Sequence, residues 1–251
     1  MARIIRRKSS TGVYHVMLRG VNKQMIFLSD ADNLRFLQIL QQVKDVSNFA
    51  LLGYCLMGNH IHLLIQEREE GEPLDKIMQR IQNRFIGWYN LSYDRCGPLF
   101  GGRFRSEAVE DERYLVTVLR YIHQNPVKAG ICRRMSDYKW SSYGDYADGK
   151  ALLEGLVDTE VAEGMFGKNE LLRFFDECSD DVCLDDLTPE EMEKTYFSIY
   201  NEISGGCFDE AFEKLSWEQK REIVENCKKK GVPLKKLSEY TGMSCYKLRK
   251  L

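Results

Sequence analysis

The sequence lacks any long apolar segment. Of its 251 residues, 43% are hydrophobic and 29% are charged, and no apolar run approaches the roughly 20 residues of a transmembrane helix. The basic N-terminal segment, residues 1–8, is not followed by the apolar core and cleavage site of a signal peptide. We therefore expect a soluble globular protein and not a membrane-spanning or exported one.

The sequence also lacks any Cys-x-x-Cys pair, although it contains eight cysteines. Their scattered positions argue against a zinc knuckle and against a disulfide framework. Free thiols are typical of a reducing compartment, so the pattern predicts a cytoplasmic protein.

The net charge of −2 conceals three segments of different sign. Residues 1–150 carry 22 basic and 16 acidic side chains, residues 151–215 carry 4 and 18, and residues 216–251 carry 10 and 4. Chance distribution of solvated faces is the alternative, but the middle segment is too one-sided to favour it. We predict two anion-binding domains, 1–150 and 216–251, separated by an acidic helical connector, 151–215.

Hydrophobic periodicity predicts both strands and helices in the first domain. The predicted strands are 11–19, 49–57 and 60–66, and the predicted helices are 31–46, 74–93 and 112–125. The last two strands are expected to form a hairpin around Gly58 and Asn59. Asp30 is expected to cap the first helix. Pro126 is expected to end the third helix, because proline disfavours helical geometry at the preceding residue.

Two histidines, His60 and His62, lie two residues apart in the third predicted strand. Side chains alternate between the faces of a strand, so both imidazoles point the same way, with α-carbons roughly 7 Å apart. Such a pair can bind one divalent metal ion. The alternative is a pair of hydrogen-bonded core histidines or a surface pair, which the short motif alone does not exclude.

A second motif places two arginines around an aromatic ring, at Arg103, Phe104 and Arg105. If the segment is a strand, both arginines lie on one face and Phe104 lies on the other. The planar guanidinium donates two parallel hydrogen bonds to a phosphate, so the pattern favours contact with a nucleic-acid backbone. An exposed strand with a buried phenylalanine has the same geometry.

Tyr121 and Asn125 are four residues apart near the end of the third predicted helix. They are therefore neighbours on one helix face, beside the apolar stripe. Taken alone, Tyr121 is better explained as a tyrosine at a helix edge.

Together these segments resemble those of the single-tyrosine HUH transposases of the IS200-like family, and most of all the REP-associated tyrosine transposases. The similar segments are Gly58-Asn59-His60-Ile61-His62, Gly102-Arg103-Phe104-Arg105-Ser106, and Tyr121-Ile122-His123-Gln124-Asn125-Pro126-Val127-Lys128-Ala129-Gly130. The opening Tyr14-His15-Val16 with Arg19-Gly20 is similar to the first strand of that family. The resemblance covers residues 10–146.

The resemblance implies an α+β fold, in which helices pack on the antiparallel sheet of a ferredoxin-like HUH nuclease. It implies that His60 and His62 are metal ligands, with Asn125 at the position of a third, amide ligand. It implies that Tyr121 is the nucleophile and that the metal is Mg²⁺ or Mn²⁺. The expected activity is that of a DNA transposase and nickase, which cleaves single-stranded DNA near hairpins as a monomer or a homodimer.

The residues suit this chemistry. A tyrosine hydroxyl is a weak nucleophile and a phosphodiester is already anionic, so both need assistance. A metal ion held by two imidazoles and an amide has open positions for phosphate oxygens. Attack by Tyr121 gives a 5′-phosphotyrosine and a free 3′-hydroxyl, which a later reversal can rejoin. The candidate phosphate contacts are Arg103, Arg105, Lys128, Arg133 and Arg134.

Trp140 is a candidate stacking platform for a base. The alternative, which we favour, is an aromatic side chain that closes the domain core.

The last segment predicts a helix-turn-helix module. Ser216 is expected to cap a helix over 217–229, a second helix covers 234–240 after a break at Gly231-Val232-Pro233, and Ser244 caps a third helix that reaches Leu251. The third helix carries Lys247, Arg249 and Lys250, as a groove-binding helix does, and could contact duplex DNA. A small three-helix interaction module is the alternative.

Two other functions compete with the transposase. One is a DNA-binding regulator whose nuclease fold is inactive or secondary. The other is a metal-dependent nuclease in which water attacks in place of Tyr121. A regulator has no use for two histidines, a tyrosine and an amide that converge on one point, and a hydrolase would not need Tyr121.

Overall fold

The computed structural model describes residues 8–147, 151–177, 183, 189–204, 212–230, 232 and 234–251. The chain divides into two compact units, Met1–Glu177 and Cys178–Leu251. No helix among the described residues is both long enough and apolar enough to cross a membrane. Each unit is described separately below.

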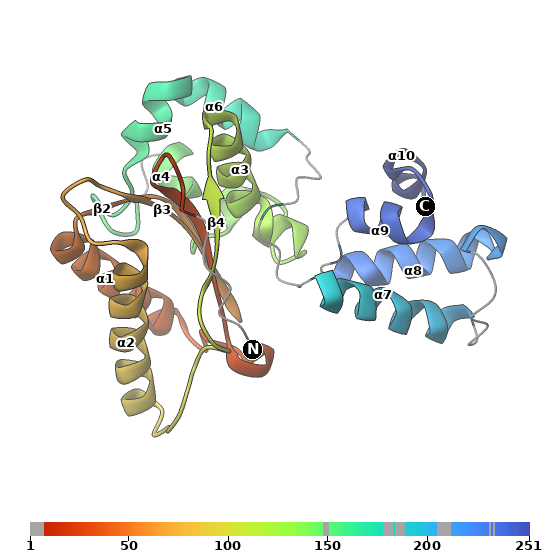
Figure 1. Cartoon of the computed structure of the whole chain (residues 1–251), viewed down its shortest axis with the longest axis horizontal. Helices are drawn as coiled ribbons and strands as arrows, with labels where there is room; N and C mark the ends of the chain where they lie inside the picture. The colour runs from red at the N-terminus through yellow and green to blue at the C-terminus, as the bar shows by residue number, and fades with distance from the viewer. Residues whose placement is uncertain are drawn as a thin grey trace. The chain divides into compact units, whose positions relative to one another are not determined.

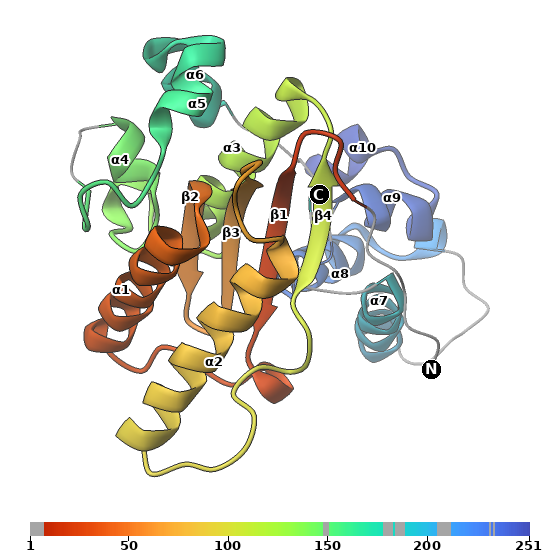
Figure 2. The ribbon, with the colours of Figure 1, turned by 60° about the vertical axis from the view of Figure 1, so that its left-hand side comes forward.

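A four-stranded antiparallel sheet forms the centre of the first unit, with strand order β2-β3-β1-β4 (Figure 2). The strands are β1 (Val13–Arg19), β2 (Phe49–Met57), β3 (His60–Glu67) and β4 (Arg105–Val109). Strands β2 and β3 form the predicted hairpin, with Met57 paired to His60 across the Gly58-Asn59 turn. Strand β1 pairs with both β3 and β4, so it lies in the middle of the sheet.

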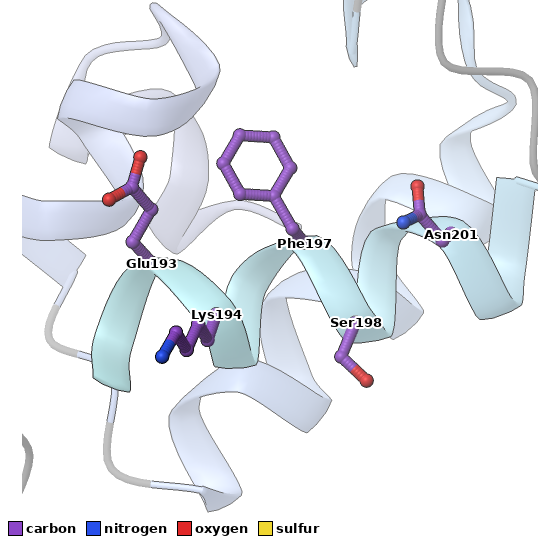
Figure 3. Close-up of a pocket in the computed structure, with 5 residues that line it drawn as sticks. All are labelled: Glu193, Lys194, Phe197, Ser198 and Asn201. Carbon is purple, nitrogen blue, oxygen red and sulfur yellow. The ribbon is translucent and has the colours of Figure 1, made fainter. Parts of the chain in front are cut away.

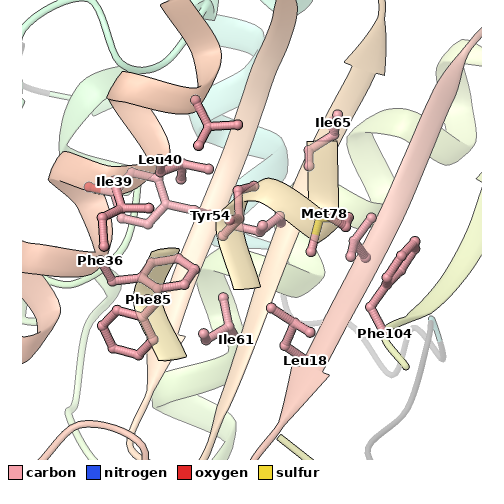
Figure 4. Close-up of a cluster of buried hydrophobic side chains, with 14 of the residues drawn as sticks. Leu18, Phe36, Ile39, Leu40, Tyr54, Ile61, Ile65, Met78, Phe85 and Phe104 are labelled. Atoms are coloured by element: carbon pink, nitrogen blue, oxygen red, sulfur yellow. The ribbon is translucent and has the colours of Figure 1, made fainter. Parts of the chain in front are cut away.

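Helices α1 (Asp30–Ser47) and α2 (Leu74–Ser92) cover one face of this sheet. Figure 4 shows Phe36 of α1 and Phe85 of α2 packed with Leu18 and Ile61 of the strands. These side chains are almost completely buried, which stabilises the fold by removing apolar surface from water. The N-cap of α1 is Ser29 and not the expected Asp30. The backbone N–H of Ser29 donates to Asp32 Oδ2 at 2.8 Å, which is one half of a capping box.

Helix α3 (Glu112–Lys128) lies on the opposite face of the sheet (Figures 1 and 2). It is capped by Asp111, whose carboxylate accepts from the backbone N–H of Tyr114 at 2.7 Å. A Cβ atom at Gly53 of β2 would lie 2.8 Å from Leu119 Cδ2, so a larger residue there would require the Leu119 side chain to move. Helix α3 thus packs closely against β2 at this glycine.

The prediction that Pro126 ends this helix is wrong, because α3 continues to Lys128. A proline in the last turn removes only one backbone donor. The stop signal is Gly130, which has φ +71° and donates to Val127 O at 3.0 Å, while Ile131 N–H donates to Pro126 O at 2.9 Å. These two bonds form a Schellman motif that satisfies the terminal carbonyls.

Residues 151–177 pack on the first unit and do not form part of a separate connector. Helices α4 (Tyr143–Ala147), α5 (Thr159–Phe166) and α6 (Lys168–Asp176) belong to this unit, and the rings of Phe175 and His123 lie 4.8 Å apart. The boundary predicted at residue 150 therefore differs from the observed division after Glu177. The segment is acidic on its exposed side, but its apolar side chains Leu171 and Phe175 are buried where α6 packs against α3.

The second unit is helical in the part that the structure describes. It contains α7 (Pro189–Ser204), α8 (Trp217–Lys229), α9 (Leu234–Thr241) and α10 (Cys245–Arg249), whose core includes Tyr196, Ile199, Ile223, Leu237 and Leu248. Ser216 and Ser244 cap α8 and α10 as expected, although α10 ends at Arg249. Residues 178–182, 184–188 and 205–211 of the predicted connector, and Gly231 and Pro233 of the predicted break, lie outside the described residues.

Three short 3₁₀ helices, Val21–Lys23, Met135–Asp137 and Phe212–Lys214, complete the described elements.

Asp158 ties the acidic segment to the edge of the sheet. Its carboxylate accepts from the Leu51 backbone N–H at 2.8 Å, from Lys44 Nζ at 2.7 Å and from Arg68 Nη2 at 3.1 Å, and its own N–H donates to Leu51 O. Asp158→Ala should lower the free energy of unfolding by about 3 kcal/mol, because it removes the counter-ion of the largely buried Lys44 ammonium and leaves the Leu51 N–H without its side-chain acceptor. The carbonyls of Gly155 and Leu156 still accept from Lys44 Nζ in the variant.

Urea unfolding at pH 7 measures this change, with Glu160→Ala as the matched control because Glu160 is exposed in the first turn of α5. The interpretation fails if the two variants are equally stable.

Candidate active site

Histidine side chains from two strands meet on the face of the sheet that α3 covers. Strand register pairs Met17 of β1 with His62 of β3 and Arg19 with His60, so the odd-numbered residues of β1 share a face with the even-numbered residues of β3. His60 and His62 therefore point the same way, as predicted, and His15 points the same way from β1.

The three imidazoles form a continuous cluster. Ring centroids are 5.1 Å apart for His60 and His62 and 5.2 Å apart for His62 and His15. The atoms His15 Nε2 and His62 Nδ1 lie at the hydrogen-bond distance of 3.0 Å. All three side chains are buried, with His15 and His62 completely inaccessible to solvent.

Tyr121 projects from α3 onto this cluster. Its ring centroid lies 5.7 Å from that of His62 and 5.8 Å from that of His15, and both contacts are edge-to-face. Lys128, two turns later in α3, places Nζ 5.4 Å from the centre of the Tyr121 ring. The fold thus brings together the predicted nucleophile and the predicted histidines within one chain.

The nitrogen atoms of His60 and His62 suit a metal ion. The Nδ1 atom of His60 donates to Asn59 Oδ1 at 2.7 Å, which leaves a lone pair on Nε2. The Nε2 atom of His62 is buried and has no hydrogen-bond partner among the described residues. An orphaned imidazole nitrogen at this position fits a metal ligand, since a buried polar atom otherwise needs a partner.

Asn125, the expected third ligand, lies one turn after Tyr121 in α3 and is half-buried. Within the described ranges, no group of three or more His, Cys, Asp or Glu side chains is arranged to hold a metal. A metal at His60 and His62 therefore requires ligands of another kind, such as an amide or a phosphate oxygen.

Burial keeps the imidazoles of His15 and His62 neutral, and a neutral imidazole is the form that binds metals. Burial, with a smaller effect of the Arg105 charge, lowers the pKa of His15 to about 3. The pKa of His62 is lowered well below its ordinary value, first by burial and then by His60, His15, Arg19 and Arg105.

Of the five predicted phosphate contacts, two lie near the histidines and Tyr121, and three lie elsewhere on the surface. Arg105 lies in β4 opposite Met17, on the face of the histidines, and Lys128 contacts the Tyr121 ring. Arg103 precedes β4 in an exposed bend, so residues 103–105 do not form one strand and the condition for a shared face of the two arginines is not met. Arg133 is exposed after α3, and Arg134 forms an ion pair with Asp137 at 3.0 Å.

Trp140 has the role that the sequence favoured. Its ring packs against the hydrophobic core and its backbone carbonyl accepts from Leu56 N–H at 2.9 Å. It therefore closes the domain core.

Sequence reasoning missed His15 as a site residue. The only hint in the sequence was that His15 lies within a predicted strand. The register that brings His15 to His62 is set by the pairing of β1 with β3, and the local sequence does not encode it.

The basic side chains of the second unit are exposed. Lys247, Arg249 and Lys250 lie on or directly after α10, and Lys250 Nζ is 4.4 Å from the centre of the exposed Tyr246 ring. A shallow hollow along α7 is lined by Glu193, Lys194, Phe197, Ser198 and Asn201 (Figure 3). All five of these side chains come from one helix, and they do not enclose a site.

Comparison with known proteins supports the resemblance drawn from the motifs. Residues 8–125 match the family described as "Transposase IS200 like". The match covers a little under half of the chain, and it includes the segments that carry His15, His60, His62 and Tyr121.

Within the class, the chain is similar to the REP-associated tyrosine transposases. It is 24% identical over 141 residues to a Haemophilus influenzae (strain ATCC 51907 / DSM 11121 / KW20 / Rd) protein whose name assigns it to that group, which covers 53% of this chain and 80% of the relative. The structure of a REP-associated tyrosine transposase bound to a REP hairpin superposes with a TM-score of 0.52 at 19% identity, and covers 63% of this chain and 93% of that one. This likeness confirms the α+β fold of the first unit.

Acidification from pH 7 to pH 5 should destabilise the metal-free chain by roughly 4 kcal/mol. The imidazoles of His15, His62 and His123 are neutral in the fold, because burial lowers each pKa, but they gain protons near pH 6.5 once unfolded. Stability is therefore lost as pH falls below 6.5. The raised pKa of Asp145, about 6, opposes part of this loss.

Urea unfolding in EDTA at the two pH values measures the effect. The variant His123→Gln should reduce the difference by about 2 kcal/mol, nearly half of it, and equal stability of the parent chain at both pH values would contradict the explanation.

Proposed function

We propose that the chain is a metal-dependent endonuclease and strand transferase that cleaves single-stranded DNA near hairpins through Tyr121. The observation that carries the proposal is the contact of the Tyr121 ring with His62 and His15, beside His60. The match of residues 8–125 to the IS200-like transposase family supports DNA as the substrate. The relative of similar fold was solved with a REP hairpin, which supports a hairpin as the structure recognised.

In the proposed reaction, the Tyr121 oxygen attacks a backbone phosphorus atom. The new bond joins the tyrosine to the 5′-phosphate, the bond from phosphorus to the 3′-oxygen breaks, and the tyrosine proton leaves to solvent or to the departing oxygen. A 3′-hydroxyl can later attack the phosphotyrosine and restore a phosphodiester. No external energy source is needed, because the ester bond is conserved.

His60, His62 and Asn125 would hold the metal ion, Mg²⁺ or Mn²⁺. When bound, such an ion neutralises charge on the phosphate oxygens. The ammonium of Lys128 beside the Tyr121 ring favours negative charge developing on the phenolic oxygen. Arg105, on the same face of the sheet as the histidines, is placed to contact the phosphate.

We also propose that the second unit binds duplex DNA through the exposed basic residues of α10. The succession of α8, α9 and α10, with a capped third helix, supports a helix-turn-helix module. The alternative function, a DNA-binding regulator, relies on this unit alone and gives the histidines and Tyr121 no role.

The variant Tyr121→Phe should abolish a covalent protein–DNA adduct. With Mg²⁺ or Mn²⁺ and a single-stranded DNA that contains a hairpin, a 3′-end label should migrate with the parent chain on a denaturing gel, and a 5′-end label should be released. The exposed tyrosine variant Tyr246→Phe is the matched control and should retain the adduct.

Cleavage that survives in Tyr121→Phe would indicate attack by water. Binding without cleavage by the parent chain would favour the regulator.

The triple variant Lys247→Gln, Arg249→Gln, Lys250→Gln should weaken duplex binding and lower the magnitude of the slope of log affinity against log salt by about 3, because each phosphate contact releases about 0.9 counterions. Titrations at several salt concentrations measure this. The control changes the same charge elsewhere in the unit, at the exposed Lys214, Lys228 and Lys235. Equal slopes for the two triple variants would exclude α10 as the contact.

A further inference from the structure

His15 has no part in the reaction as proposed, although it is completely buried in the site. It contacts His62 through a ring nitrogen pair at 3.0 Å and lies edge-to-face with Tyr121. Its other nitrogen, Nδ1, is buried and has no hydrogen-bond partner among the described residues. A buried imidazole with one engaged and one orphaned nitrogen requires an explanation.

The two histidines expected to bind metal differ in the hydrogen-bond partner of their Nδ1 atoms. His60 Nδ1 contacts a carbonyl oxygen, Asn59 Oδ1, which can only accept, so the proton of His60 is fixed on Nδ1. His62 Nδ1 contacts His15 Nε2, which can either donate or accept. If His15 donates, the proton of His62 moves to Nε2 and the atom that should bind metal loses its lone pair. If His15 accepts, Nε2 of His62 is free to coordinate.

Glu107 is placed to bias this choice, although its carboxylate is not hydrogen-bonded to His15 Nδ1 in the structure. Strand register places it directly opposite His15 in β4, on the same face of the sheet, and its Oε2 atom is buried without a hydrogen-bond partner in the described part of the chain. Directly opposed side chains have Cβ atoms about 5 Å apart, within reach of a carboxylate–imidazole bond. A carboxylate favours a proton on His15 Nδ1, and a neutral His15 then accepts at Nε2.

We propose that His15, supported by Glu107, is a positioning residue that holds the proton of His62 on Nδ1 and so keeps its Nε2 atom ready for a divalent metal. The inference deepens the proposed function, because it assumes that His62 is a metal ligand. It assigns a row of side chains, Glu107, His15 and His62, across three neighbouring strands. Outer groups of this kind orient a ligand imidazole and raise its affinity for metal.

The first test measures the tautomer directly. Long-range ¹H–¹⁵N correlation spectra of the full, metal-free chain with ¹⁵N-labelled histidine report which nitrogen of His62 carries the proton. We expect Nδ1–H for His62 and for His60 in the parent chain, and a shift of His62 toward Nε2–H in Glu107→Leu. An Nε2–H form of His62 in the parent chain would overturn the proposal.

The second test measures Mn²⁺ affinity from the electron paramagnetic resonance signal of the free ion, without DNA. His15→Phe removes the acceptor and should weaken binding by about 10- to 100-fold. His15→Gln places an amide near the position of Nε2 and should restore affinity to within about threefold. His123→Gln, which alters a buried histidine that contacts Ser142, is the control and should bind as the parent does.

Equal affinity of His15→Phe and the parent would refute the role, as would a Gln variant as weak as the Phe variant. Circular dichroism checks the fold, and if His15→Phe does not fold, the tautomer of the parent chain and the Gln variant decide the question. If the Tyr121 adduct is never formed but the Mn²⁺ pattern holds, the strand-transfer proposal fails and the role of His15 stands.

Discussion

Side chains alternate between the two faces of a β-strand, so the candidate site residues of the first unit lie on one face of the sheet and its hydrophobic core lies on the other. In β1, Tyr14, Val16 and Leu18 belong to the hydrophobic core with α1 and α2, while His15 and Arg19 lie on the face of α3. The same alternation in β3 sends Ile61 to the core and the histidine pair to the other side. A slip of one residue in the β1–β3 register would exchange these faces, so the pairing that stabilises the core also assembles the site.

Helix α3 completes the candidate site from the face of the sheet that carries the histidines. Its Leu119 packs against Gly53, its Tyr121 contacts the imidazoles, and its Arg120 reaches in another direction toward residues 174–177. The guanidinium of Arg120 stacks 3.8 Å from the Phe174 ring centre and bonds Glu177 at 3.2 Å, and Gln124 donates to Phe175 O at 2.7 Å. The helix is therefore held from both the sheet and the acidic segment, which reduces the entropy lost when a substrate binds.

Local sequence was sufficient for the elements that carry the principal site residues. The β2–β3 hairpin, the pairing of His60 and His62 on one face, and the placement of Tyr121 near them all followed from strand alternation, turn chemistry and motif resemblance. The end of α3 was missed because the Gly130 stop lies beyond a proline that the helix tolerates. The role of His15 and the attachment of residues 151–177 depend on contacts between segments far apart in sequence, such as Asp158 with Leu51, which no local pattern encodes.

The anchoring and reactive residues of α3 are offset by a single position, since Arg120 and Gln124 precede Tyr121 and Asn125 by one residue each. One residue corresponds to about 100° around a helix. An insertion or deletion between Leu119 and Tyr121 would therefore rotate the phenol away from the imidazoles whenever the Gly53 contact was kept. The length of this stretch of helix is therefore constrained as tightly as the identity of Tyr121.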